Sequence, residues 1–327
     1  MSSQENAVAF IGLGVMGYNM AVNLRTKMPK EQTLVVCDVS EAAISRFREQ
    51  MKDSGPVVIA KTGSEAIQQA CSYSYILVCQ DTIITVLPND AACDSVYLDP
   101  STGILAGVKQ QPSSGSSPSK IAMECGTMSL EIINRIRDAS AQCGLAFVDA
   151  PISGGPLGAK AGTLTIMVGC DEPLFPKIKP LLAYMGTSIR RCGAVGSGTA
   201  FKTINNYMSI TQVLVASEAL NIGAKLNLNM SELIDTINSS SGQSWITSKN
   251  NPVPGITPGG AASNDYEGGF RIELGQKDLK LGVQLAKMAG AKPLLSIETL
   301  KTLEEVASDP RYAGKDLRVV YKWLNEQ

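Results

Sequence analysis

A glycine-rich turn near the N-terminus constrains the fold of this chain more than any other feature. Residues 7–11 form an unbroken apolar run, the pattern of a strand buried on both faces of a parallel sheet. A G-x-G-x-x-G turn follows, and a helical pattern covers 16–27. A strand, this turn and a helix in direct succession predict a Rossmann-type site, where the pyrophosphate of a dinucleotide lies against the helix N-terminus. The predicted cofactor-binding residues of the turn are Gly12, Leu13, Gly14, Val15, Met16 and Gly17.

Asp38 ends the second apolar run, 33–37, and points to NAD as the cofactor. It follows the last glycine of the turn by about 20 residues, where dinucleotide-binding folds place the acid that binds the ribose. A carboxylate there accepts hydrogen bonds from ribose hydroxyls and repels a 2′-phosphate, and neither Val39 nor Ser40 offers a positive charge. The alternative role for Asp38 is the N-cap of the helical pattern that begins near Ser40.

Strand patterns alternate with helical patterns up to residue 192, which predicts a doubly wound α/β sheet. Only helical patterns follow, so the chain is expected to consist of a Rossmann-type domain, 1–192, and an all-helical domain, 193–327. A Pro/Ser/Gly-rich stretch, 111–119, is expected to be a flexible surface loop, and 71–80 carries no chemistry that can be assigned. The further predicted strands cover 57–60, 82–87, 121–124, 146–150, 163–169 and 187–191, and the predicted C-terminal helices cover 199–225, 231–239, 272–289, 296–307 and 315–324.

Ser153, Gly154 and Gly155 follow the predicted strand 146–150, at the edge of the sheet where such folds bind ligands. A hydroxyl and exposed backbone N–H groups can bind a carboxylate or a phosphate. The segment is therefore a candidate substrate-binding site, and an ordinary glycine-rich turn is the alternative.

Lys202 and Asn206 lie one turn apart on the predicted helix 199–225, which follows two glycines. The chain has no histidine, so a lysine, tyrosine, cysteine or carboxylate must carry out any acid–base step. Both side chains can point at one oxygen-containing ligand. A solvated lysine and asparagine on the protein surface are the alternative.

Composition excludes several classes of function. Lys+Arg number 29 and Asp+Glu number 30, a balance that favours neither nucleic acid nor an anionic membrane as a partner. The 8 cysteines are scattered and no C-x-x-C occurs, so no metal site is expected and the thiols suggest an intracellular protein. Residues 1–6 lack the basic and apolar parts of a targeting segment, which predicts a cytoplasmic location.

The motifs, taken in order, resemble those of the β-hydroxyacid dehydrogenase family. Segments 10–17, 149–155, 196–206 and 277–279 match four motifs of that family, and 251–255 with 266–270 are similar to its hydroxyisobutyrate branch. The resemblance implies a fold like that of 6-phosphogluconate dehydrogenase. It also implies NAD-dependent oxidation of a small 3-hydroxy acid, 3-hydroxyisobutyrate, and assembly as a homodimer or homotetramer. Mitochondrial relatives make the mitochondrial matrix the alternative location.

The resemblance also implies roles for single residues. Lys202 matches the catalytic general acid/base and Asn206 the amide that contacts substrate beside it. The substrate carboxylate is expected at Ser153, Gly154 and Gly155. Further cofactor contacts are expected at Leu87, Pro88, Thr127 and Lys277.

Two positions depart from the family pattern, and two other functions stay open. Gly126 stands where the family has serine, and Ala92 where it has asparagine, so one polar contact at each position is in doubt. An NADPH-dependent reductase of another semialdehyde or of glyoxylate would use similar motifs. A nonenzymatic NAD-binding scaffold is also compatible with the fold, because a Rossmann fold does not by itself imply activity.

Overall fold

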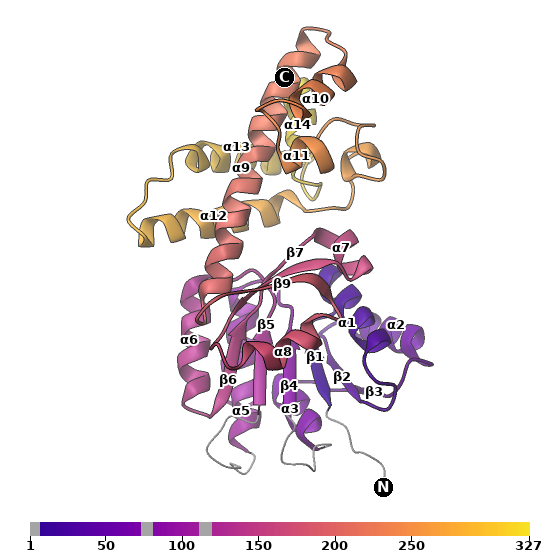
Figure 1. The fold of residues 1–327 in the computed structure, drawn as a ribbon, viewed down its shortest axis with the longest axis vertical. Helices are drawn as coiled ribbons and strands as arrows, with labels where there is room; N and C mark the ends of the chain where they lie inside the picture. Colours follow the sequence, from indigo (N-terminus) through magenta and orange to yellow (C-terminus); the bar gives the residue numbers. More distant parts are fainter. Residues whose placement is uncertain (1–6, 73–80, 111–119) are drawn as a thin grey trace. The chain divides into compact units, whose positions relative to one another are not determined.

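The computed structural model describes residues 7–72, 81–110 and 120–327 (Figure 1). The predicted surface loop, 111–119, and most of the 71–80 segment lie outside the described residues. The chain divides into two compact units, Met1–Lys202 and Thr203–Gln327. The domain limits expected from the sequence, 1–192 and 193–327, stay a prediction.

A nine-stranded sheet forms the centre of the first unit, among the residues that the structure describes (Figure 1). Its order is β3-β2-β1-β4-β5-β6-β8-β7, and β9 also pairs with β8. Neighbouring strands from β3 to β6 run parallel, whereas β8 is antiparallel to β6 and β7. The strands are β1 (Val8–Ile11), β2 (Leu34–Cys37), β3 (Val57–Ile59), β4 (Asp81–Thr85), β5 (Lys120–Glu124), β6 (Leu145–Asp149), β7 (Ile152–Ser153), β8 (Leu164–Gly169) and β9 (Gly186–Gly193).

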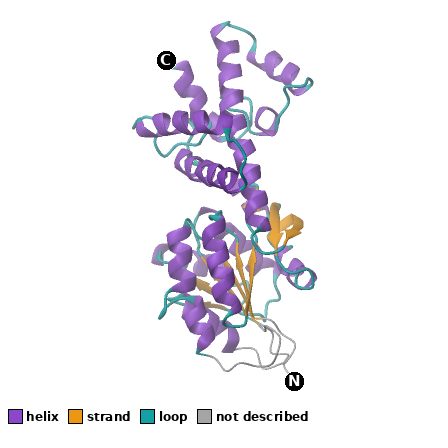
Figure 2. Ribbon diagram, turned by 90° about the vertical axis from the view of Figure 1, so that its left-hand side faces the viewer, coloured by secondary structure: helices purple, strands orange, loops and turns teal. Residues whose placement is uncertain are grey.

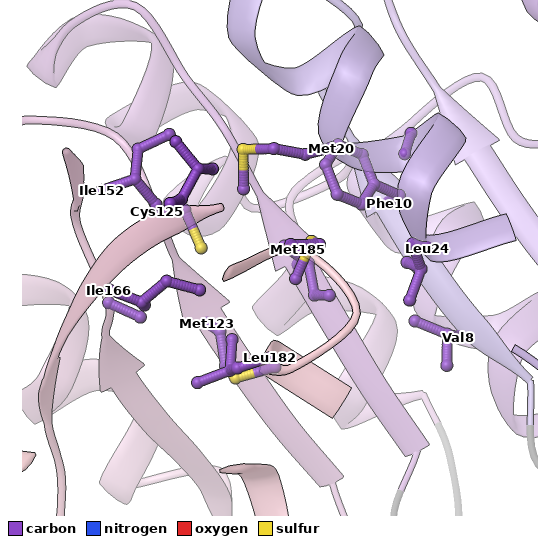
Figure 3. Close-up of a cluster of buried hydrophobic side chains, with 14 of the residues drawn as sticks. Val8, Phe10, Met20, Leu24, Met123, Cys125, Ile152, Ile166, Leu182 and Met185 are labelled. Atoms are coloured by element: carbon purple, nitrogen blue, oxygen red, sulfur yellow. The ribbon is translucent and has the colours of Figure 1, made fainter. Parts of the chain in front are cut away.

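Helices cover both faces of this sheet, which confirms the doubly wound fold. Alternate residues of β1 explain the unbroken apolar run: Phe10 belongs to one buried cluster and Ala9 to the other. The first cluster joins β1 to helices α1 and α8 (Figure 3), and the second joins β1 to α3, α5 and α6. The helices of this unit are α1 (Val15–Lys27), α2 (Glu41–Met51), α3 (Gly63–Ser72), α4 (Asp90–Cys93), α5 (Ile104–Lys109), α6 (Leu130–Ala141), α7 (Gly155–Ala161) and α8 (Phe175–Leu182), with a π-helical turn, η1, at Asp94–Leu98.

The second unit is helical in all of its named elements, as predicted (Figure 2). Its core joins Ile210 and Leu214 of α9 to Leu279 and Leu303 of two other helices. No helix among the described residues is long and apolar enough to cross a membrane. The elements are α9 (Ser197–Lys225), whose first residues belong to the first unit, α10 (Met230–Asn238), α11 (Trp245–Lys249), the 3-10 turn η2 (Ala261–Asn264), α12 (Ile272–Met288), α13 (Leu294–Ser308) and α14 (Val319–Asn325).

The predicted start of the last helix, at 315, is wrong, because α14 begins only at Val319. Asp316 pairs with Arg271 in an isolated bridge, and its carboxylate accepts a hydrogen bond of 2.7 Å from the backbone N–H of Phe270. Arg318 also pairs with the Asp316 carboxylate. The bonds of Asp316 to Phe270 and Arg271, some 45 residues earlier, hold 315–318 out of the helix, and such contacts leave no periodic pattern in a sequence.

Candidate functional site

The glycine turn has the shape that a dinucleotide requires. Gly12 has a φ of +99°, and a side chain there would collide with the carbonyl oxygen of Val86. A side chain at Gly17 would collide with the carbonyl oxygen of Gly12, whereas no protein atom lies within 4 Å of a Cβ built on Gly14. The N-terminus of α1, capped by Gly14, receives no side-chain hydrogen bond. The turn is therefore closely packed on the protein side and open on the side where a pyrophosphate would bind.

Asp38 lies beside this turn at the end of β2. Its Oδ2 accepts a hydrogen bond of 2.5 Å from the backbone N–H of Leu13, and its Oδ1 accepts one of 2.7 Å from the N–H of Ser40. The N-cap of α2 is Ser40, whose hydroxyl accepts from Ala43 N, so the alternative role of Asp38 as that cap is wrong. The carboxylate is instead fixed against the glycine turn, a position that suits ribose recognition.

Glu124 joins the two segments that hold the predicted residues Leu87, Pro88 and Thr127. Its Oε1 accepts hydrogen bonds from Gly126 N at 2.6 Å and from Leu87 N at 3.5 Å. Its Oε2 accepts one of 2.5 Å from the hydroxyl of Thr85. The side chain is fully buried, and this burial raises the pKa of the Glu124 carboxyl to about 7.

Both departures from the family pattern have a local explanation. A side chain at Gly126 would approach both the carbonyl oxygen of Leu87 and Glu124 Oε1 to 2.6 Å, so glycine is the residue that this packing admits. The backbone N–H of Ala92 donates to the side chain of Asn89, the N-cap of α4, at 2.9 Å. Asn89 follows Leu87 and Pro88 directly, three positions before Ala92, so an asparagine is present close to the position where the family has one.

The Asp149–Gly155 segment has two parts with different environments. Ser153 lies in the short strand β7, which the sequence did not predict, and Gly154 and Gly155 have φ values of +136° and +63°. No protein atom lies within 4 Å of a Cβ built on Gly155, so its backbone is open to a ligand. Asp149, by contrast, is fully buried and accepts hydrogen bonds from Gly196 and Thr199.

Lys202 and Asn206 are buried, with 7% and 8% of their surfaces exposed, so the alternative of a solvated surface pair is wrong. The side-chain NH₂ of Asn206 donates to Asp278 Oδ2 at 2.6 Å, and Asp278 also forms an ion pair of 3.3 Å with Lys277. An ionised aspartate can only accept, so the amide nitrogen of Asn206 must face Asp278 and its carbonyl oxygen must face away.

The sheet register brings the predicted residues of the first unit to one edge. Ile11 pairs with Cys37 and Thr85, Thr85 with Glu124, and Glu124 with Asp149. The glycine turn, Asp38, the Leu87–Pro88 segment and the Asp149–Gly155 segment therefore follow the carboxyl ends of adjacent strands, where α/β sheets bind ligands. In the second unit, Asp278 connects Asn206 to Lys277. The roles of all these residues stay predictions.

The sequence did not reveal the hydrogen bonds of three buried carboxylates, Glu124, Asp149 and Asp278. An acidic residue at the end of a buried strand was the available signal for the first two, and Asp278 lies within the family motif at 277–279. Among the residues with described placement, no group of histidine, cysteine and acidic residues could hold a metal ion.

Comparison with known proteins covers the whole chain. The family model described as the NAD binding domain of 6-phosphogluconate dehydrogenase matches residues 7–196, and that described as NAD-binding of NADP-dependent 3-hydroxyisobutyrate dehydrogenase matches 196–324. The mitochondrial 3-hydroxyisobutyrate dehydrogenase of Drosophila melanogaster is 33% identical, with 100% of this chain and 92% of the relative covered. An NAD-dependent L-serine dehydrogenase of Pseudomonas aeruginosa is 33% identical, with 96% of each covered.

A solved structure is similar over nearly its full length. It is that of Mycobacterium tuberculosis 3-hydroxyisobutyrate dehydrogenase with L-serine, which is 29% identical and superimposes with a TM-score of 0.81. The match covers 98% of this chain and 99% of that one.

Proposed function

The chain belongs to the β-hydroxyacid dehydrogenase family, and we propose that within it the protein catalyses NAD-dependent oxidation of 3-hydroxyisobutyrate to methylmalonate semialdehyde. As a member of that family it is an oxidoreductase that uses NAD(P) and a small hydroxy acid. The observation that carries the choice of substrate is the similarity, over the full chain, to 3-hydroxyisobutyrate dehydrogenases. In a cell this activity would belong to valine breakdown.

The preference for NAD over NADP rests on Asp38. Its carboxylate is held by Leu13 N and Ser40 N beside the glycine turn, so its negative charge cannot swing away. A 2′-phosphate bound there would be repelled by this charge. Neither Val39 nor Ser40, the next two residues, carries a positive charge that could offset the repulsion. An NADPH-dependent reductase is therefore the less favoured alternative.

The mechanism assigns one task to each predicted site residue. Ser153, the backbone of Gly154 and the open backbone of Gly155 bind the carboxylate of the substrate. Lys202, in its neutral form, accepts the proton of the 3-hydroxyl group and returns it in the reverse direction. Asn206, whose amide Asp278 orients, contacts the substrate beside Lys202. The bound dinucleotide supplies the hydride acceptor.

L-Serine is the second candidate substrate. A relative of equal identity is named an NAD-dependent L-serine dehydrogenase, and the similar solved structure is described with L-serine. Serine and 3-hydroxyisobutyrate share a carboxylate and a 3-hydroxyl group, and they differ at C2 in an ammonium against a methyl group. The substrate panel must therefore contain both compounds.

The test is the formation of reduced nicotinamide, followed by its absorbance. The purified protein receives NAD or NADP together with 3-hydroxyisobutyrate, L-serine, 3-hydroxypropionate, 4-hydroxybutyrate or 6-phosphogluconate. The highest kcat/KM is expected for 3-hydroxyisobutyrate with NAD. A higher value for L-serine would replace the substrate and keep the mechanism. If no compound is oxidised although NAD binds, the nonenzymatic scaffold becomes the better explanation.

Self-association is also part of the proposal. Met208, Val215 and Ile222 of α9 are exposed apolar residues at intervals of seven, the spacing of a seam between packed helices. Leu294 and Leu295 are also exposed, and together with Met208 and Val215 they line a groove of about 760 Å³ in the second unit. A second copy of the chain would bury these side chains, in a homodimer or homotetramer. The cytoplasm and the mitochondrial matrix both stay open as the location.

A further inference from the structure

Asp149 links the predicted substrate segment to the helix that carries Lys202. It is the last residue of β6, four positions before Ser153, and its side chain is fully buried. Its Oδ1 accepts a hydrogen bond of 2.7 Å from Gly196 N, and its Oδ2 accepts one of 2.6 Å from Thr199 N. Hydrogen bonds that a carboxylate accepts from N–H groups are stronger than those between neutral groups.

The first turn of α9 depends on this carboxylate. The first N–H groups of a helix have no partner within the helix, and a side chain directly before the helix usually satisfies them. Here Ser197 N bonds to Ala194 O and Ala200 N to Gly196 O, both within the local chain. Thr199 N instead bonds to Asp149, 50 positions away in the sequence. The cap of α9 is therefore a tertiary contact.

Two glycines show independently that this junction is built for close contact. A side chain at Gly198 would collide with the carbonyl oxygen of Met167 and approach the carbonyl oxygen of Asp149 to 2.9 Å. A side chain at Gly169 would collide with the carboxylate of Asp149. The start of α9 thus rests directly on the backbone of β6 and β8, and no side chain separates them.

We propose that Asp149 is a positioning residue, which holds the first turn of α9 so that Lys202 keeps a fixed distance from the Ser153–Gly155 segment. Lys202 lies three residues after Thr199, about 4.5 Å along the helix axis. A shift at the first turn therefore reaches Lys202 almost undiminished. This inference rests on the proposed role of Lys202 as general acid/base.

The first variant is Asp149→Asn. Its amide keeps one acceptor oxygen and turns an NH₂ group toward the other N–H donor, so one of the two bonds from backbone N–H groups is lost. A misplacement of about 1 Å in a catalytic group can lower a rate by about 100-fold. We expect kcat per NADH-binding site to fall by about 10- to 100-fold, while the KM for NAD changes less than about 2-fold.

The number of NADH-binding sites separates positioning from general damage. A merely structural role would lower the binding stoichiometry and the total rate together and leave the rate per site unchanged, which would overturn the proposal. Asn229→Ala is the matched control. The side chain of Asn229 caps α10 in the second unit by accepting hydrogen bonds from Ser231 N and Glu232 N, and the variant removes this cap. The control is expected to keep the wild-type rate per site.

Hydrogen exchange tests the same contact without any substrate. In Asp149→Asn the amides of 196–202 are expected to exchange about ten times faster, whereas those at the start of α6, which Ser129 caps, should not change. Unchanged exchange at 196–202 would show that Asp149 does not hold the first turn of α9, whatever the activity. If the wild type oxidises no hydroxy acid but the exchange result is as expected, the proposed function is wrong, whereas the contact of Asp149 with the first turn of α9 is confirmed.

Gly198→Ala provides a second variant in case Asp149→Asn does not fold. It leaves the carboxylate in place and pushes the helix away from Met167 O. It should lower the rate per NADH-binding site in the same way. A wild-type rate in this variant would show that the close contact of Gly198 with β6 and β8 does not position Lys202.

Discussion

Glu124 is expected to make the stability of the sheet depend on pH. Burial raises the pKa of this carboxyl from an ordinary 4.5 to about 7 in the folded protein. Between these two values the folded state binds a proton that the unfolded state has lost, so the free energy of unfolding falls as pH rises from about 4.5 to about 7. Each pH unit is worth about 1.4 kcal/mol, which gives a loss of about 3 kcal/mol across this range.

Glu124→Gln removes the titration and keeps the shape. The amide is neutral at every pH, like the protonated acid, and it can donate to the hydroxyl of Thr85 while its oxygen accepts from Gly126 N. The hydroxyl of Thr85 lies 3.3 Å from the carbonyl oxygen of Met123 and can then donate its hydrogen bond to that oxygen. The free energy of unfolding of the variant should therefore fall less steeply with pH than that of the wild type over this range. The difference in stability, variant minus wild type, should be larger at pH 8 than at pH 5.

The assay must follow the sheet itself, because both tryptophans, Trp245 and Trp323, lie in the second unit. Urea-dependent hydrogen exchange of a peptide that contains β5, corrected for intrinsic exchange at each pH, measures the opening of this region. Glu49→Gln, at an exposed helical position, is the control for removal of a glutamate charge. If the wild type and Glu124→Gln give parallel curves of opening free energy against pH, the reasoning is refuted.

Three further predictions concern the cofactor, the chemistry and the assembly. Lys202→Met should lower kcat by at least about 100-fold and leave NAD affinity nearly unchanged in a fluorescence titration, because it removes the proton acceptor alone; normal turnover would exclude Lys202 as the acid/base. Asp38→Asn should raise the ratio of kcat/KM with NADP to that with NAD by about tenfold, since the repulsion of the 2′-phosphate is lost; an unchanged ratio would mean that Asp38 does not select the cofactor. Val215→Asp, at a position 54% exposed on α9, should lower the molar mass measured by light scattering, because a charge in an apolar seam opposes packing. A mass equal to that of the wild type would place the interface elsewhere.

Patterns of short range explain why so much of the first unit could be predicted. Every predicted strand from 7–11 to 187–191 is present within about two residues at each end. The central strands β1 and β2 are buried throughout, and such parallel strands are continuous apolar runs. The two-residue strand β7 escaped because it is too short to show any alternation. The late start of α14 escaped because the bonds of Asp316 join it to residues far away in the chain.

The sequence alone predicts most strands of the sheet, the glycine turn, and the set of residues that follow the strand ends. Periodicity and the steric needs of glycine express these features locally, so a single chain reveals them. The packing of the elements in three dimensions settles which carboxylates are buried and which groups they bind. Glu124 bonds to Thr85 across 39 positions, Asp149 to Thr199 across 50, and Asn206 to Asp278 across 72. Each of these bonds joins residues that come together only when separate elements pack, and a buried carboxylate must find such donors because leaving it unpaired would cost several kcal/mol.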